Sequence, residues 1–158
     1  MQAETSRGST PQAFSRQLFI AAQEGVYAEA LREIRKGKKE SHWMWFVFPQ
    51  LRGLGQSDMA KTYGIADLEE ARAYLADIIL GPRLKLIAEE LLKLDKQDAQ
   101  EIFGDLDAKK LKSSMTLFAH ADEKEGSVFR NVLQQYFNGE EDDVTNAILA
   151  IQNLDFTI

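Results

Sequence analysis

Apolar residues recur along most of this chain at spacings of three and four, which is the period of one face of an α-helix. The clearest example follows Gly81-Pro82, where Leu84, Ile87 and Leu91 mark the apolar face. Similar patterns, most of them bounded by a capping residue or a glycine, predict helices at residues 12–23, 26–36, 58–63, 67–76, 109–119, 128–137 and 143–151. Asp98 is expected to cap a short turn that ends at Phe103-Gly104. We therefore expect an all-α fold of about eight helices, several of them short, joined by irregular glycine-containing loops.

Residues 41–50 depart from this pattern, because they contain an unbroken apolar run from Trp43 to Phe48. A short run of this kind fits a buried strand and a buried helical turn equally well. No second convincing strand is present to pair with it, and an unpaired strand would leave backbone groups unsatisfied. We therefore predict a short buried helix that begins near Ser41 and stops before Pro49, since the residue before a proline disfavours helix.

The length of 158 residues and the apolar content of 44% fit one globular domain. Residues 1–11 are too polar to offset the entropy of ordering them, so we expect a frayed tail followed by a single helical domain at residues 12–158. The longest apolar run is that from Trp43 to Phe48, whereas a membrane-spanning helix needs about 20 residues. The start of the chain lacks the features of a secretory signal. We expect a cytoplasmic protein that does not enter a membrane.

The composition excludes several kinds of site. Cysteine is absent, which removes disulfides, thiolate nucleophiles, iron–sulfur clusters and cysteine-containing zinc sites. Only His42 and His120 are present, and neither HExxH nor EF-hand spacing occurs, so we expect no metal site and no cofactor. The formal net charge of −6 argues against binding nucleic acid by phosphate neutralisation. Nothing in the sequence indicates the oligomeric state.

The aromatic stretch is the first candidate site. His42 lies beside Trp43 in apolar surroundings that would shift its pKa, as a general acid or base requires; the alternative is a histidine hydrogen-bonded to backbone. Trp43 and Trp45 can stack on a planar ligand, although such residues more often belong to the core. Gln50 follows Pro49 and can bind the edge of a ligand with its amide, or can close the loop with a hydrogen bond.

The second candidate is the helix around Lys110. On a helix Lys110 is adjacent to Ser113 and Ser114, so one edge presents an ammonium group beside two hydroxyls and can hold an anion. The alternative is that these hydroxyls bond back to carbonyl groups of the preceding turn. Basic residues including Lys38 also gather near the aromatic stretch and hint at an anionic ligand, or form a solvated helix end.

Residues 37–57, with the sequence GKKESHWMWFVFPQLRGLGQS, resemble the signature of a bacterial family known as domain of unknown function 1810. Residues 70–75, 80–84, 102–104 and 111–118 also fit the family, in the order it uses, so that the similarity spans about residues 14–151. The chain departs from the family where Asp77-Ile78 replaces a His-Pro pair. It also departs at Asn146, which follows Asp143-Val-Thr145 where the family pattern has Leu. The resemblance implies a mainly helical fold.

The family motifs match at His42, Trp43, Trp45, Gln50, Ser113, Ser114 and Thr116, so the resemblance implies that these residues form parts of one site. The fold would have to bring residues 41–57 and 110–118 together. We expect a pocket there for a small planar or anionic, nucleotide-like ligand, with Lys38 and Lys110 holding its charge and His42 as acid or base if a reaction occurs. The alternatives are a non-catalytic protein-interaction module and, third, an RNA-contacting protein.

Overall fold

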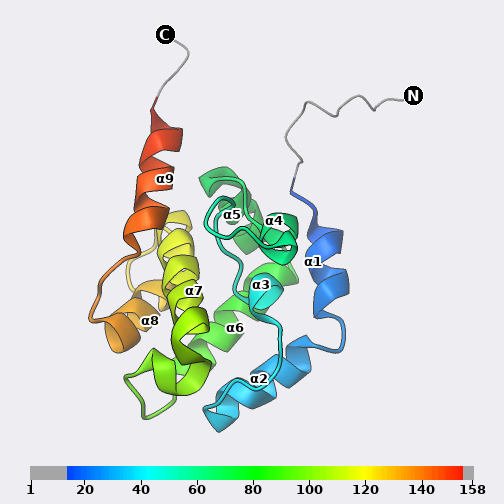
Figure 1. Cartoon of the computed structure of the whole chain (residues 1–158), viewed down its shortest axis with the longest axis vertical. Helices are drawn as coiled ribbons and strands as arrows, with labels where there is room; N and C mark the ends of the chain where they lie inside the picture. Colours follow the sequence, from blue (N-terminus) through cyan, green and yellow to red (C-terminus); the bar gives the residue numbers. More distant parts are fainter. Residues whose placement is uncertain (1–13, 155–158) are drawn as a thin grey trace.

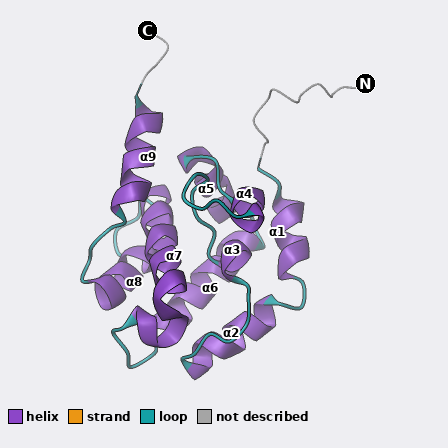
Figure 2. Cartoon of the chain, in the orientation of Figure 1, coloured by secondary structure: helices purple, strands orange, loops and turns teal. Residues whose placement is uncertain are grey.

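The computed structural model describes residues 14–154, and that part of the chain folds into helices joined by loops (Figures 1 and 2). The helices are α1 (Arg16–Gln23), α2 (Tyr27–Lys36), α3 (Met44–Val47), α4 (Asp58–Tyr63), α5 (Leu68–Ala76), α6 (Leu80–Leu92), α7 (Ala99–Ala121), α8 (Val128–Phe137) and α9 (Asp143–Asn153). Within these residues no strand forms, apart from an isolated parallel bridge between Leu51 and Ile65. The predicted all-α fold class is confirmed.

Local capping residues determine most helix ends. Side chains of Ser57, Asp67 and Asp98 accept hydrogen bonds from the first turns of α4, α5 and α7, as the sequence predicted. Gly37, with φ of 83°, ends α2 in the left-handed conformation that favours glycine. These short-range interactions explain why the sequence pattern located most helices correctly.

Several helix starts differ from the prediction, and the buried helix expected from near Ser41 begins at Met44. The first helix was expected from residue 12, but Ser15 caps α1, so the helix begins at Arg16. The helix at Gly81-Pro82 begins earlier, at Leu80, because the Asp77 carboxylate accepts hydrogen bonds from the N–H groups of Ile79 and Leu80. The predicted tail at residues 1–11 lies outside the described residues.

A break at Gly104 divides α7 into a short and a long part. Gly104 has φ of 80° and ψ of 172°, which a residue with a side chain rarely adopts. The predicted turn ending at Phe103-Gly104 is therefore confirmed. The break turns the chain before Asp105 and Asp107, and the long part of α7 then continues into the core.

The core lies around α7, which packs against α5, α8 and α9. The short helix α3 is buried as predicted, with Met44 and Val47 each about 1% exposed. An aromatic series runs through the core, since the ring of Phe118 contacts those of both Tyr74 and Phe129. No helix within residues 14–154 is long and apolar enough to cross a membrane.

Candidate functional site

The two stretches that the sequence singled out, residues 41–57 and 110–118, lie against each other in the structure. The Gln50 side chain donates a hydrogen bond of 3.2 Å to the Ser113 hydroxyl. The ammonium group of Lys110 lies 5.0 Å from the ring centroid of Trp45, at a distance typical of a cation–π contact. The loop that follows α3 is thereby joined to the long part of α7.

A surface hollow of about 390 Å³ opens where these stretches meet. Its walls include Lys39, His42, Trp45, Phe103, Asp107 and Lys110. We call it the Trp45 hollow. It combines a half-buried aromatic ring with charged and titratable side chains, and its volume lies within the range of ligand sites in proteins.

The two tryptophans have different roles. Trp43 is 0% exposed, packs against Phe48 and Phe103, and donates from its indole nitrogen to Glu33 over 2.8 Å. It therefore has no accessible face on which a ligand can stack, and it belongs to the core. Trp45 is half-buried and lines the hollow, so it is the tryptophan that a ligand can reach.

A buried carboxylate holds the start of the aromatic stretch. Glu33 is 0% exposed and accepts hydrogen bonds from the backbone N–H groups of Glu40 and Ser41, the Ser41 hydroxyl and the Trp43 indole. Burial alone raises the pKa of Glu33, but the combined hydrogen bonds outweigh it and lower the pKa to about 2. Glu33 could not be recognised from the sequence, because its partners Glu40, Ser41 and Trp43 lie beyond the end of α2 and only the fold brings them to it.

Asp107 links both lysines of the hollow. The Lys39 side chain is only 8% exposed, and its ammonium group lies 2.8 Å from the Asp107 carboxylate and over the Trp43 ring. Lys110 lies 3.5 Å from the other oxygen of Asp107. This carboxylate fixes Lys39 firmly, whereas the Lys110 contact is longer and the Lys110 side chain is more exposed.

His42 lies at the rim of the hollow with its side chain exposed. The expectation that His42 lies in apolar surroundings was wrong, because its side chain is exposed. Ser41 and Trp43 on either side are both held by Glu33, and this leaves the intervening His42 directed outward. An exposed imidazole remains able to contact a ligand in the hollow.

The predicted hydroxyls do not line the hollow. Ser113, Ser114 and Thr116 are 3% exposed or less, so the expected edge of hydroxyls beside Lys110 is not present. Ser113 shares a hydrogen bond of 3.1 Å with Thr145 of α9, and Thr116 both donates to the carbonyl of Lys112 and accepts from the N–H of Asp142. These residues join α7 to α9 rather than bind an anion.

Ser114 differs from its neighbours, because its hydroxyl oxygen is buried without a hydrogen-bond partner among the described residues. It shares the face of α7 that carries Leu111, Met115 and Phe118. The same spacing in the sequence is the signal from which the buried position of Ser114 could have been predicted, in place of the exposed edge that we expected.

Comparisons with known proteins show which proteins this chain resembles. Over residues 13–149, the sequence matches the family described as protein of unknown function (DUF1810). The chain belongs to the DUF1810 family. Among solved structures it is similar to the conserved hypothetical protein Rv1873 from Mycobacterium tuberculosis, with 48% sequence identity and a TM-score of 0.84. The match covers 87% of this chain and 97% of that one. A search of curated proteins found no match.

In this DUF1810 protein, acidic partners neutralise most of the basic cluster near the aromatic stretch. The ion pairs are Arg32 with Glu29, Arg35 with Glu90, Lys36 with Glu40 and Lys39 with Asp107. Lys38 is exposed and does not line the Trp45 hollow, so the structure does not bring it to the site. Most of these basic residues are therefore paired with carboxylates, and Lys38 lies apart from the hollow.

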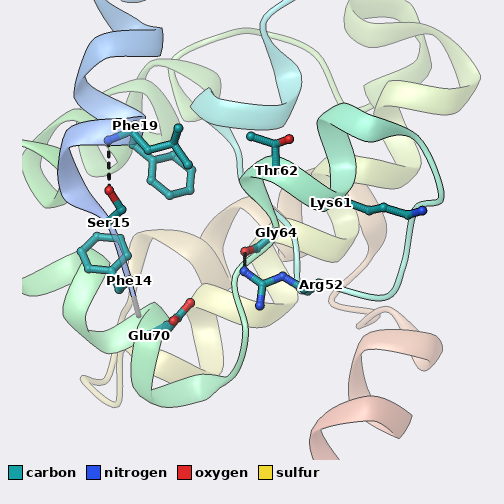
Figure 3. Close-up of a pocket in the computed structure, with 9 residues that line it drawn as sticks. Phe14, Ser15, Phe19, Arg52, Lys61, Thr62, Gly64 and Glu70 are labelled. Atoms are coloured by element: carbon teal, nitrogen blue, oxygen red, sulfur yellow. Dashed lines mark hydrogen bonds between the residues drawn. The ribbon is translucent and has the colours of Figure 1, made fainter. Parts of the chain in front are cut away.

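A second pocket, of about 440 Å³, lies between α1, the loop after α3 and the ends of α4 and α5 (Figure 3). Arg52 and Glu70 are among its lining residues, and we call it the Arg52 pocket. This pocket was not expected from the sequence, because Arg52 and Glu70 are brought together by tertiary structure alone.

Within residues 14–154, no three His, Asp or Glu side chains are grouped in a way that would hold a metal ion.

Proposed function

We propose that the Trp45 hollow binds a small planar ligand that carries an anionic group, as a nucleotide does. The observation that carries the proposal is the half-buried Trp45 ring with the Lys110 ammonium group 5.0 Å from its centroid, at a hollow of about 390 Å³. An accessible indole ring offers a planar group a stacking surface, which contributes about 1–3 kcal/mol per nucleic acid base in known complexes.

Lys110 supplies the charge for the anionic group. In the absence of a ligand it is held by Trp45 and by the long contact to Asp107. A ligand that stacks on Trp45 replaces the ammonium group over the ring, and its anion then accepts hydrogen bonds from the displaced Lys110. Lys39 is held by Asp107 and stays in the wall of the hollow, so Lys110 is the lysine that responds to the ligand.

His42 contributes from the rim. Its exposed imidazole can donate a hydrogen bond to the anion or to an edge of the planar group. If the ligand is transformed, His42 is the group placed to transfer a proton. Gln50, Ser113 and Thr116 support the site from behind, since their hydrogen bonds fix the loop after α3 and α9 to α7.

The proposal is tested by a thermal-shift screen of nucleotides and anionic metabolites against the wild type, Lys110→Met and His42→Ala. A ligand at 100 times its dissociation constant stabilises the wild type by about 2.7 kcal/mol. We expect Lys110→Met to reduce this stabilisation strongly and His42→Ala to reduce it in part.

Lys109→Met is the matched control, because Lys109 is an exposed neighbour on the same helix and does not line the hollow. It should respond to the ligand as the wild type does. The proposal fails if no compound stabilises the wild type, or if the Lys109 and Lys110 variants lose the response equally.

A further inference from the structure

The Arg52 pocket holds a fixed guanidinium group. The backbone of Arg52 donates to the carbonyl of Ile65 over 2.7 Å, and Ile65 donates to the carbonyl of Gln50 over 2.8 Å. The Arg52 side chain donates to the carbonyl of Gly64 over 2.9 Å, a contact visible in Figure 3. A guanidinium group has five N–H donors, so this one contact leaves others for a ligand.

Glu70 provides a carboxylate on the other side of the pocket. One of its oxygens accepts the backbone N–H of Ala66 over 2.9 Å, which positions the side chain at the start of α5. In Figure 3 the Glu70 carboxylate and the Arg52 guanidinium group face each other across the pocket. Within residues 14–154, Arg52 and Glu70 do not form an ion pair with each other. Their charged atoms are therefore more than 4.0 Å apart.

The remaining wall of the pocket is partly apolar and partly polar. Phe14, Leu18 and Phe19 form its apolar side, with the Phe14 and Phe19 ring centroids 6.1 Å apart and the rings inclined by 28°, and Ser15 and Thr62 add hydroxyl groups. Lys61 also lines the pocket, but Figure 3 shows its ammonium group directed away from Arg52 and Glu70. Near its centre the pocket therefore presents the Arg52 cation, the Glu70 anion and an apolar side, with Lys61 at the edge.

We infer that the Arg52 pocket binds a small zwitterion with an apolar body, namely a free amino acid with an aromatic or aliphatic side chain. Its carboxylate accepts hydrogen bonds from Arg52, its ammonium group donates to Glu70, and its side chain packs against Phe14 and Leu18, which are the accessible apolar residues of the wall. A simple anion would be repelled by the Glu70 carboxylate, and a simple cation would be repelled by the Arg52 guanidinium group. A zwitterion satisfies both charges, and charge-assisted hydrogen bonds are the stronger kind.

The test is isothermal titration of the full chain with L-phenylalanine and L-leucine, beside 3-phenylpropanoate, which lacks the ammonium group, and phenethylamine, which lacks the carboxylate. We expect the amino acids to bind at least about tenfold more tightly than either of the other compounds, which corresponds to about 1.4 kcal/mol. The inference is overturned if 3-phenylpropanoate or phenethylamine binds as well as phenylalanine, or if neither amino acid binds up to millimolar concentration.

Glu70→Gln keeps an oxygen for the N–H of Ala66 and removes only the charge. It should abolish the preference for phenylalanine over 3-phenylpropanoate. Glu69→Gln makes the same change on the exposed neighbour and should leave the preference intact. If Glu70→Gln and Glu69→Gln have the same preference for phenylalanine over 3-phenylpropanoate, Glu70 does not bind the ammonium group.

Arg52→Gln retains a donor for the carbonyl of Gly64 and should weaken amino acid binding more than tenfold. Arg72→Gln, which removes a surface ion pair with Glu123, is the matched control. Because Arg52→Gln can also disturb folding, Arg52→Lys is measured beside it and should bind with intermediate affinity. Retention of full affinity in a folded Arg52→Gln protein contradicts the inference.

Discussion

Glu33 connects α2 to the segment that carries His42 and Trp43. Its carboxylate accepts four hydrogen bonds, and all of them come from residues 40–43. A buried acceptor that satisfies several donors is costly to remove, because the donors then lack partners away from water. We regard Glu33 as the residue that keeps Trp43 inward and leaves Trp45 and His42 at the surface.

The lowered pKa of Glu33 predicts a specific pH dependence of stability. Its folded pKa of about 2 lies below the ordinary value of 4.5, so its contribution is present above about pH 4.5 and is lost as pH falls towards 2. We expect Glu33→Gln to lower the free energy of unfolding at pH 7 by on the order of 2–3 kcal/mol.

Urea unfolding from pH 7 to pH 2.5 checks this expectation. Other carboxylates, including Asp77 and Glu141, also have pKa values lowered to about 2, so both proteins lose stability in acid. The difference between wild type and Glu33→Gln isolates Glu33 and should shrink as pH falls below about 4.5. A difference that stays constant with pH would contradict the assigned role.

At the scale of elements, the close approach of α4 to the loop after α3 builds the Arg52 pocket. Gly64 follows α4 with φ of −66°, so its backbone conformation does not require glycine. A Cβ atom there would instead lie 2.9 Å from the carbonyl oxygen of Ala60 and 2.9 Å from the Cα of Arg52. The absence of a side chain at Gly64 permits this packing.

Gly64→Ala tests the packing. At a conformation that alanine can adopt, the substitution should stabilise by about 0.4–1 kcal/mol, so any loss must come from the steric contact. We expect a net loss of about 1–3 kcal/mol in thermal or urea unfolding, as for other overpacked sites.

Gly126→Ala serves as the comparison, because Gly126 has φ of +71° and open space around its Cβ position. It should show only the conformational cost of a left-handed residue, about 1 kcal/mol. A neutral or stabilising effect of Gly64→Ala would contradict the close packing of α4 against Arg52 that the structure shows.

Sequence predicted the elements where the deciding interactions are local. Ser57, Asp67 and Asp98 cap helices within three residues of themselves, and Gly37 ends α2 by its own backbone conformation. The start of α6 was misplaced because the Asp77 carboxylate caps at Leu80, two residues before the proline that the pattern favoured.

The candidate site was predicted only in part, because the orientation of its side chains depends on tertiary packing. The sequence located Trp45 and Lys110, and the fold brings them together. It did not distinguish Trp45 from Trp43, since that difference depends on Glu33 ten residues earlier in the chain. The Arg52 pocket could not be predicted, as Arg52 and Glu70 lie on separate elements.

At the scale of the whole molecule, ion pairs between distant residues redistribute the charge that the sequence suggests. Arg35 pairs with Glu90 on α6, and Lys39 pairs with Asp107 on α7. Carboxylates from distant parts of the chain thus pair with residues of the basic cluster. Lys110 and Arg52 each line a hollow that also has an aromatic residue in its wall.

The most direct test of the proposed function is tryptophan fluorescence during titration with the four ribonucleoside monophosphates. Trp43 is buried and Trp45 is accessible, so a stacked ligand should quench Trp45 alone. We predict saturable quenching in the wild type, the same quenching in Lys109→Met, and its loss in Trp45→Phe, in which Trp43 still fluoresces. Quenching that persists in Trp45→Phe, or that no nucleotide produces in the wild type, would contradict the account.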